Sequence, residues 1–397
     1  MDKLLDQLII RWEQAFDDIK NLPAYKAAVK TTQYAENTRY NLEKFDKNSF
    51  PSDGALSNKK QSYQYGFNDQ GLPCYVAFNH DHNKLFWEGY YNYTDNLAEY
   101  IEFNINTGTP SAITRVIFEN GRKVLTQRLF VNGGGAGYAH LKDARAELIR
   151  KYKENADSFF LTASRFLFDQ EGKVIRSEGI HITPGIGKYT SHNEYTYVDN
   201  QLDKIKTFDA NGNGRLTFSR NRDNLSQEAL VEKLAMAMAQ EITNTLHHQE
   251  MNEPLALLEL GYHYADNYLP LLGIQTQQQI AERRDKGELA FITDNYLDAI
   301  IDISSFEDLF AQMEQLMEEK SDMKIGRTTL TRAAAILTET KLFGKIKTTG
   351  DFAAFAIDWS IEGHSTEHLV EILLECGVKK ETITKWKENK LLVSHGK

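Results

Sequence analysis

One repeated pattern constrains the fold of this chain more than any other feature. From residue 63 to residue 218, apolar and polar residues alternate, a turn of Asn or Asp follows, usually with Gly, and the alternation resumes. Such turns recur at residues 68–71, 106–108, 120–121, 169–172, 199–200 and 209–212. These residue types tolerate the backbone angles of tight hairpin turns, and alternation is typical of a strand with one buried face. Because a single hairpin is marginal in water, the pattern predicts a meandering antiparallel sheet, curved and covered by helix on one side.

Four stretches of this region, at residues 63–79, 100–125, 164–178 and 195–218, share an aromatic-x-aromatic-Asp/Asn order followed by Gly and an apolar pair. In this they resemble the YD repeats of Rhs-type proteins and related hairpin repeats. The resemblance implies hairpin architecture. YD arrays keep a nearly fixed period and form long shells, whereas here the spacing varies and a helical stretch at 139–157 interrupts the series.

Helical periodicity precedes the hairpin region. Residues 3–20 carry apolar residues at steps of three and four, which predicts an amphipathic helix. Its apolar stripe comprises Leu5, Leu8, Ile9, Trp12, Phe16 and Ile19. We expect this stripe to pack on the chain's own sheet; the alternative is a second copy of the chain in a homodimer.

After residue 221 the helical period continues to the end of the chain, and Ser226 stands where an N-cap is needed. Further helical stripes are predicted at residues 255–268, 277–286, 306–317, 330–337, 366–376 and 381–389. The sequence therefore predicts an α+β fold: an antiparallel β-hairpin meander with N-terminal and inserted helices, followed by an all-helical C-terminal domain. The expected boundaries are 1–50 for the N-terminal helical segment, 60–220 for the hairpin domain and 225–397 for the helical domain.

Bulk composition narrows the partners. The chain has 56 acidic residues against 46 Lys and Arg, a formal net charge of −10. This argues against nucleic acid, which needs a cationic face, and suits a basic protein. Two cysteines make no disulfide framework, and no apolar run approaches the roughly 18 residues that cross a bilayer. Because Arg11 and Glu13 interrupt the first apolar stretch, no signal peptide is expected, and the predicted location is the cytoplasm.

Two histidine motifs could bind a metal, and each has a simpler interpretation. His364 and His368 fit the inverted zinc-peptidase pattern H-x-x-E-H, but Ser365 as an N-cap would leave His364 outside the helix. The pair His80 and His82 stands in a hairpin turn and lacks the third and fourth ligands of a zinc site. We predict no metal and no catalytic residue set.

A glycine-rich loop follows a predicted strand and precedes the inserted helix, an arrangement that can cradle a phosphate. It contains Gly133, Gly134, Gly135 and Gly137. The Lys-Ser/Thr of a P-loop is missing, and the dinucleotide spacing fails at Tyr138. We interpret the loop as a joint between sheet and helix, with ligand binding as the alternative, and we predict no cofactor.

The densest unusual feature is the aromatic segment 86–95. At the strand period Trp87, Tyr91 and Tyr93 share one face, while Phe86 and Tyr90 share the other. The simpler interpretation is a strand covered on both faces. The alternative is an exposed aromatic platform of the kind that dominates interface hot spots, in which nearby acidic residues select a basic partner. These acidic residues are Glu88, Asp95, Glu99 and Glu102.

These observations together favour a non-catalytic, cytosolic protein-binding role. Its most concrete form is an immunity protein that neutralises a bacterial toxin, its basic partner, by occluding the toxin's active site; the YD-like pattern suggests this only by analogy. The expected partner-binding residues are Trp87, Glu88, Tyr91, Tyr93, Asp95 and Glu99. Two alternatives remain: an enzyme or nucleotide-binding protein that uses the loop 133–137, and a structural scaffold or toxin-associated shell fragment.

Overall fold

The computed structural model describes residues 2–46, 49–50, 56–80, 84–132, 145–249, 253–263, 267–286, 296–299, 301–320, 322–359 and 366–392. The chain divides into two compact units, Met1–Arg215 and Leu216–Lys397.

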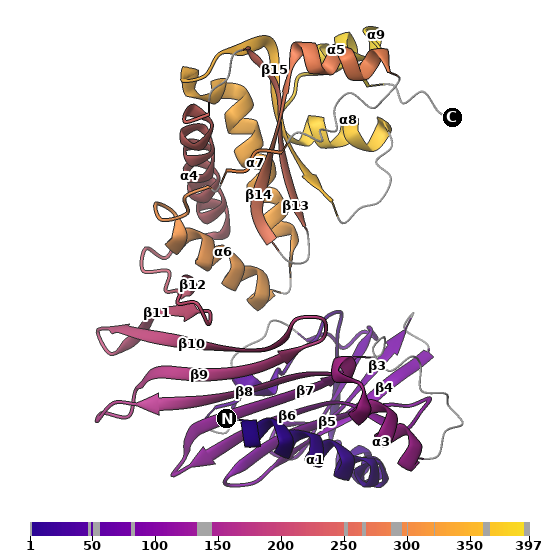
Figure 1. The fold of residues 1–397 in the computed structure, drawn as a ribbon. Helices are drawn as coiled ribbons and strands as arrows, with labels where there is room; N and C mark the ends of the chain where they lie inside the picture. Colours follow the sequence, from indigo (N-terminus) through magenta and orange to yellow (C-terminus); the bar gives the residue numbers. More distant parts are fainter. Residues whose placement is uncertain are drawn as a thin grey trace. The chain divides into compact units, whose positions relative to one another are not determined.

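The N-terminal unit is built on strands β1–β11 of a twelve-stranded sheet, whose order in the sheet equals their order in the chain (Figure 1). The last strand, β12, crosses the boundary between the two units at Arg215. The strands are β1 Thr31–Ala35, β2 Tyr63–Phe67, β3 Pro73–His80, β4 Lys84–Tyr93, β5 Leu97–Asn104, β6 Thr109–Glu119, β7 Arg122–Val131, β8 Phe159–Phe168, β9 Val174–Thr183, β10 Gly187–Val198, β11 Gln201–Phe208 and β12 Gly214–Ser219. Every pair from β1–β2 to β10–β11 is antiparallel. The predicted hairpin meander is confirmed.

The turn between β6 and β7 shows why the Asn/Asp-Gly positions matter. Its two central residues, Asn120 and Gly121, have φ of 51° and 73°. Positive φ at both positions is what a two-residue hairpin turn requires, and Asn and Gly adopt it at low cost. The turn pairs Glu119 with Arg122 and so fixes the register of both strands.

Helices cover one side of this sheet (Figure 1). They are α1 Asp2–Asp18, η1 Ile19–Asn21, α2 Leu22–Ala27, α3 Arg145–Glu154 and η3 Ala156–Ser158. The stripe of α1 packs in one core with the sheet residues Ile101, Ile113 and Leu129, as expected for docking on its own sheet. The Trp12 indole also donates to the Pro110 carbonyl at 2.8 Å. Of the predicted inserted helix 139–157, the first six residues lie outside the described part of the chain.

Part of the opposite side of the sheet is covered by residues 36–46 and 49–50, which include the short helix η2 Leu42–Lys44. Leu42 and Phe45 are buried there against Tyr65, Tyr91 and Val116. Around Tyr91 and Val116 both sides of the sheet are therefore packed.

The C-terminal unit contains a three-stranded sheet in the order β14-β13-β15. Its elements are α4 Gln227–His247, β13 Leu255–His263, β14 Asn267–Thr276, α5 Gln277–Asp285, α6 Glu307–Lys320, α7 Lys324–Thr340, η4 Leu342–Gly344, β15 Thr348–Asp358, α8 Thr366–Glu375 and α9 Lys380–Glu388. β13 runs antiparallel to β14 and parallel to β15. Helices α4, α6 and α7 lie together on one face of this sheet and α8 on the other (Figure 1). The Ser226 hydroxyl caps α4 by accepting from the Ala229 N–H.

The prediction of an all-helical C-terminal domain is wrong. The segment Leu255–His263, predicted as a helical stripe, is strand β13, and eight of its nine residues are buried. A strand with helices on both faces reads as an unbroken apolar run, which periodicity cannot distinguish from a buried helix. The helices predicted at 277–286, 306–317, 330–337, 366–376 and 381–389 are present.

Candidate functional site on the sheet

Strand β4 carries the aromatic segment, and its alternate residues point to opposite sides of the sheet. The helix-facing side packs α1 and α2; we call the other the outer side. Trp87, Tyr91 and Tyr93 belong to the outer side, as the alternation predicts, and Tyr91 packs there beneath residues 36–46 and 49–50. Glu88 of β4 and Glu99 of β5 point to the helix-facing side. The expected binding residues are thus not brought to one surface.

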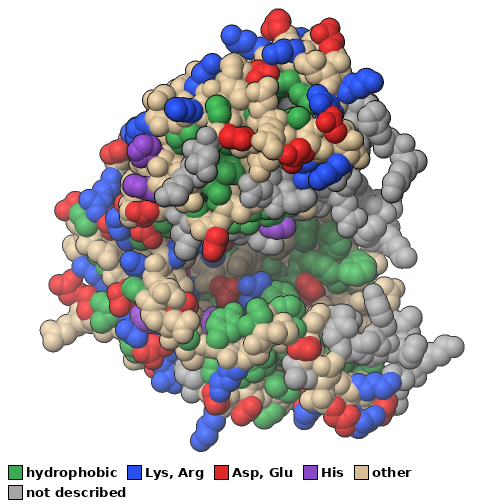
Figure 2. All heavy atoms as spheres, turned by 45° about the horizontal axis from the view of Figure 1, so that its top comes forward, with side chains coloured by type: hydrophobic (Ala, Val, Ile, Leu, Met, Phe, Trp, Pro, Cys, Tyr) green, Lys and Arg blue, Asp and Glu red, His purple; other side chains and the backbone are tan. Residues whose placement is uncertain are grey.

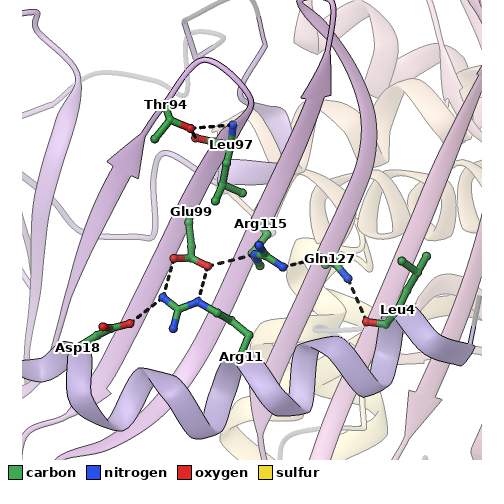
Figure 3. A network of polar contacts seen from close by, with 8 residues as sticks. All are labelled: Leu4, Arg11, Asp18, Thr94, Leu97, Glu99, Arg115 and Gln127. Carbon is green, nitrogen blue, oxygen red and sulfur yellow. Dashed lines mark hydrogen bonds and ion pairs between the residues drawn. The ribbon is translucent and has the colours of Figure 1, made fainter.

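Glu99 belongs to a buried network that fixes α1 to the sheet (Figure 3). Its carboxylate is 4% exposed and accepts two hydrogen bonds from Arg11, at 2.8 and 2.7 Å. Arg115 of β6 forms a further ion pair with it at 3.1 Å. The network extends to Asp18, Gln127 and Leu4. Glu99 is therefore committed to partners within the chain.

Glu88 is paired in the same way with α2. It is 6% exposed, accepts from the Tyr75 hydroxyl and forms an ion pair with Lys26. The Lys26 ammonium also lies 5.3 Å from the centre of the Tyr75 ring. Burial, together with the hydrogen bond to Glu88, raises the pKa of the Tyr75 phenol. Neither buried glutamate is a surface residue that could select a basic partner.

Two of the three outer aromatic residues are packed rather than displayed. Tyr91 is 4% exposed, and its ring lies 4.7 Å from that of Tyr100. The Tyr93 hydroxyl donates to the Pro73 carbonyl at 2.9 Å, and its ring lies 5.1 Å from that of Phe45. For these tyrosines the interpretation of a strand covered on both faces is correct.

Trp87 remains partly exposed on the outer side. Its ring is stacked on Phe78, with the ring centres 5.5 Å apart. Asp95 is exposed in the turn between β4 and β5. Of the expected set, Asp95 is exposed, Trp87 and Tyr93 are partly exposed, and the other three side chains are buried.

Glu102 of β5 is the acidic residue that faces the outer side. It stands opposite Gly89 of β4. The Tyr100 hydroxyl donates to its Oε2 at 3.0 Å, and the Ser111 hydroxyl donates to its Oε1 at 2.6 Å. Ser111 reaches this position because the β5–β6 register shifts beside Glu102 and leaves Ser111 as an extra residue on β6.

Gly89 makes room for this arrangement. A Cβ at this position would lie 2.8 Å from Tyr100 Cε2 and 2.9 Å from the Tyr100 hydroxyl. Since Gly89 has no side chain, the Tyr100 ring lies over β4 and brings its hydroxyl to Glu102. Burial keeps the pKa of the Tyr100 phenol well above its usual value, so the phenol acts as a donor.

Glu102 differs from the other two glutamates in its electrostatic surroundings. No Lys or Arg of the described residues forms an ion pair with it, whereas Glu88 and Glu99 each have at least one. Burial raises the pKa of Glu102, and the hydrogen bonds from Ser111 and Tyr100 only partly oppose this. The site therefore offers a desolvated, partly exposed carboxylate with two neutral donors, suited to accept a cation.

The outer side continues from Glu102 across β7–β10. Phe130 of β7 is paired with Phe160 of β8, which is 42% exposed. Tyr189 of β10 is 40% exposed and stacks on His181 of β9. Exposed aromatic side chains thus recur along this side of the sheet.

A serine–histidine pair also lies on this side. His181 Nε2 is 2.8 Å from Ser191 Oγ, and His181 Nδ1 is 3.2 Å from Thr162 Oγ1. Burial lowers the pKa of His181, so its ring is neutral near pH 7. The third position holds a hydroxyl instead of the carboxylate that stabilises an imidazolium in a catalytic triad. We interpret the row as a structural hydrogen-bond chain.

Two cavities lie away from this face. One, of about 390 Å³, has apolar walls that include Ile9, Phe159 and Ile182. Its rim carries Lys153 and Lys188, which pair with Glu13 and Asp2 at 2.6 and 2.7 Å. The other, of about 290 Å³, lies in the C-terminal unit between α5 and α9. The rim lysines of the first cavity are therefore already paired within the chain.

The remaining motifs add no site. In the described part of the chain, no group of three His, Cys, Asp or Glu residues could hold a metal ion. Gly133, Gly134, Gly135 and Gly137 lie outside the described residues, as do His82 and His364. Cys74 and Cys376 are buried free thiols. No described helix is long and apolar enough to span a membrane.

Comparison with known proteins gives no identification. No protein-family model matches this chain, and a search of curated proteins returns no similar sequence. The resemblance of the hairpins to YD repeats therefore stays a prediction.

Proposed function

We propose that this protein is a non-catalytic, cytoplasmic binding protein, and specifically an immunity protein that occludes the active site of a basic toxin. The observation that supports this best is the set of exposed aromatic side chains on the outer side of the sheet. Phe160 of β8 is 42% exposed and Tyr189 of β10 is 40% exposed, and only β9 lies between these two strands in the sheet. Exposed rings on a preformed surface are favoured anchors for a protein partner, because they bury much apolar area at little entropic cost.

The neighbours of these rings also suit a protein interface. On the same side of the sheet, Thr162 and Ser191 contact His181, and Asn193 lies farther along β10, where its amide donates to Ser177. Aromatic residues mixed with small hydroxyl and amide residues resemble the composition of antibody binding loops, in which rings supply area and small polar groups adapt their hydrogen bonds.

The negative net charge of the chain supports a basic partner, but the excess of acidic residues does not lie in the sheet, where it was expected. Residues 1–215 contain 27 acidic and 27 basic side chains, whereas residues 216–397 contain 29 acidic and 19 basic ones. The whole surplus of negative charge thus belongs to the C-terminal unit. On the face drawn in Figure 2, acidic and basic side chains are interspersed. In this proposal the C-terminal unit steers a cationic partner through its net charge, and the sheet supplies the contact.

A co-expression experiment tests the proposal. Each open reading frame that flanks the gene is expressed alone and together with this chain, and growth is measured. We expect one product to arrest growth and this chain to restore it. The double variant Phe160→Ser/Tyr189→Ser should lose the rescue. Leu167→Ser is the matched control, because Leu167 is 37% exposed on the helix-facing side.

Two results would contradict the proposal. If no flanking product is toxic, or if toxicity persists with this chain present, the immunity role is wrong. If the double variant rescues as well as the unchanged chain, the outer side is not the contact surface.

A further inference from the structure

Among the glutamates of β4 and β5, one lacks a cation. Glu88 has Lys26, and Glu99 has Arg11 and Arg115. Among the described residues, the partners of Glu102 are the hydroxyls of Tyr100 and Ser111, and no Lys or Arg pairs with it. A carboxylate that is withdrawn from water without a counter-charge costs free energy, which a cation supplied on binding recovers. We propose that Glu102 is the acceptor for an arginine side chain of a protein partner, an inference that rests on the proposed binding function.

The hydrogen bonds at Glu102 favour arginine. An ionised carboxylate has about four acceptor positions, two on each oxygen. One position on Oε2 is taken by Tyr100 and one on Oε1 by Ser111, so each oxygen retains one. Two parallel N–H groups of a guanidinium match one free position on each oxygen, whereas an ammonium is a point charge without this geometry.

Trp87 supplies the second feature of an arginine site. It is the diagonal neighbour of Glu102 on the same side of the β4–β5 ladder, because Gly89 is paired with Glu102 and Trp87 with Asn104. Diagonal neighbours are within reach of long and aromatic side chains. Since Trp87 is partly exposed, a planar guanidinium held by Glu102 can lie against its ring and gain a cation–π contact.

Arg128, a basic residue on this side, does not fill the site. Arg128 of β7 pairs with Glu43 at 3.3 Å and lies over the Phe130 ring, 4.2 Å from its centre. The position at Glu102 is thus left to a side chain from outside the described residues.

A pair of peptides tests the inference on the full chain. Acetyl-Gly-Arg-Gly-amide is compared with the same peptide carrying citrulline, which has the shape of arginine without its charge. Tryptophan is replaced by 5-fluorotryptophan, and the fluorine resonance of residue 87, assigned with Trp87→Phe, is followed by NMR during titration. We expect the arginine peptide to bind roughly tenfold or more tightly than the citrulline peptide, because only it forms the charge-assisted pair.

The variant Glu102→Gln should lose this preference, since it keeps the shape and removes the charge. Asp95→Asn, which removes an exposed carboxylate from the adjacent turn, should keep it. Equal binding of the two peptides, an unchanged preference in Glu102→Gln, or no response of residue 87 to the arginine peptide would each overturn the inference.

The two proposals can fail separately. If a toxin is found and Glu102→Gln rescues growth as well as the unchanged chain, the arginine acceptor is wrong while the immunity role stands. If no toxin is found but the peptide preference and its loss in Glu102→Gln are observed, the site stands and the immunity role is wrong.

Discussion

On the two sides of the sheet at β5, two glutamates differ in whether a basic residue of the chain balances their charge. Glu99 faces the helices, is 4% exposed and is held by two arginines. Glu102, three residues later, faces the outer side and is held by two hydroxyls. A carboxylate whose charge is balanced inside the fold secures the fold. A carboxylate whose charge is not balanced is available to something that binds.

The largest expected loss of stability comes from a substitution at Glu99, on the helix-facing side. Glu99→Gln removes the carboxylate that Arg11 and Arg115 share. Arg11 keeps its ion pair with Asp18, but Arg115 loses the one with Glu99, and the loss of one partner from a buried ion pair costs about 3–5 kcal/mol. The loss of stability in the N-terminal unit is measured by denaturant unfolding, with amide hydrogen exchange in β5–β7 as the local probe. Asp95→Asn is the control and should change the free energy of unfolding by less than about 0.5 kcal/mol. A loss as small as that of the control would show that Glu99 does not secure α1.

How far the sequence predicts the fold depends on how its strands are buried. In the N-terminal unit most strands alternate and end at residues such as Asn120 and Gly121, so period and turn chemistry locate the hairpins. In β13 and β15 most residues are apolar and buried on both faces, so no alternation marks them. The two sheets were therefore predictable to very different degrees.

The site was predictable only in part, for a related reason. Alternation within β4 places Trp87, Tyr91 and Tyr93 on one face. Alternation within β5 places Glu99 and Glu102 on opposite faces, because they are three residues apart. Alternation alone does not say which residues of β4 and β5 share a side of the sheet, since that depends on the register across the β4–β5 turn. Tyr91 is covered by residues 36–46 and 49–50, a long-range contact that no local sequence pattern predicts.

A smaller loss of stability is expected from a substitution at Gly89, on the outer side beside Glu102. Gly89→Ala places a methyl group 2.8 Å from both Tyr100 Cε2 and the Ile101 carbonyl oxygen, so Tyr100 must move away from Glu102. Such overpacking typically costs about 1–3 kcal/mol. The same unfolding measurement tests it, and the preference for the arginine peptide should fall with it. Gly350→Ala is the control, because a Cβ there meets nothing within 4 Å. A variant as stable as the control, with unchanged peptide binding, would show that Gly89 does not position Tyr100.

The smallest expected effect is on the pH dependence of stability, and it tests most directly whether the charge of Glu102 is unbalanced. Because burial raises the pKa of Glu102 in the folded chain above its value in the unfolded chain, the folded chain binds more protons just above the ordinary pKa. The contribution of Glu102 is therefore fully present at acid pH and is lost as the pH rises through the folded pKa. Glu102→Gln does not titrate, so its stability relative to the unchanged chain should rise as the pH increases from the ordinary glutamate pKa, about 4.3, through the raised pKa of the folded chain, and then level off. The arginine peptide, by supplying the missing cation, should reduce this rise. The opposite slope would mean that the fold already stabilises the ionised form of Glu102, and the contrast with Glu99 would then disappear.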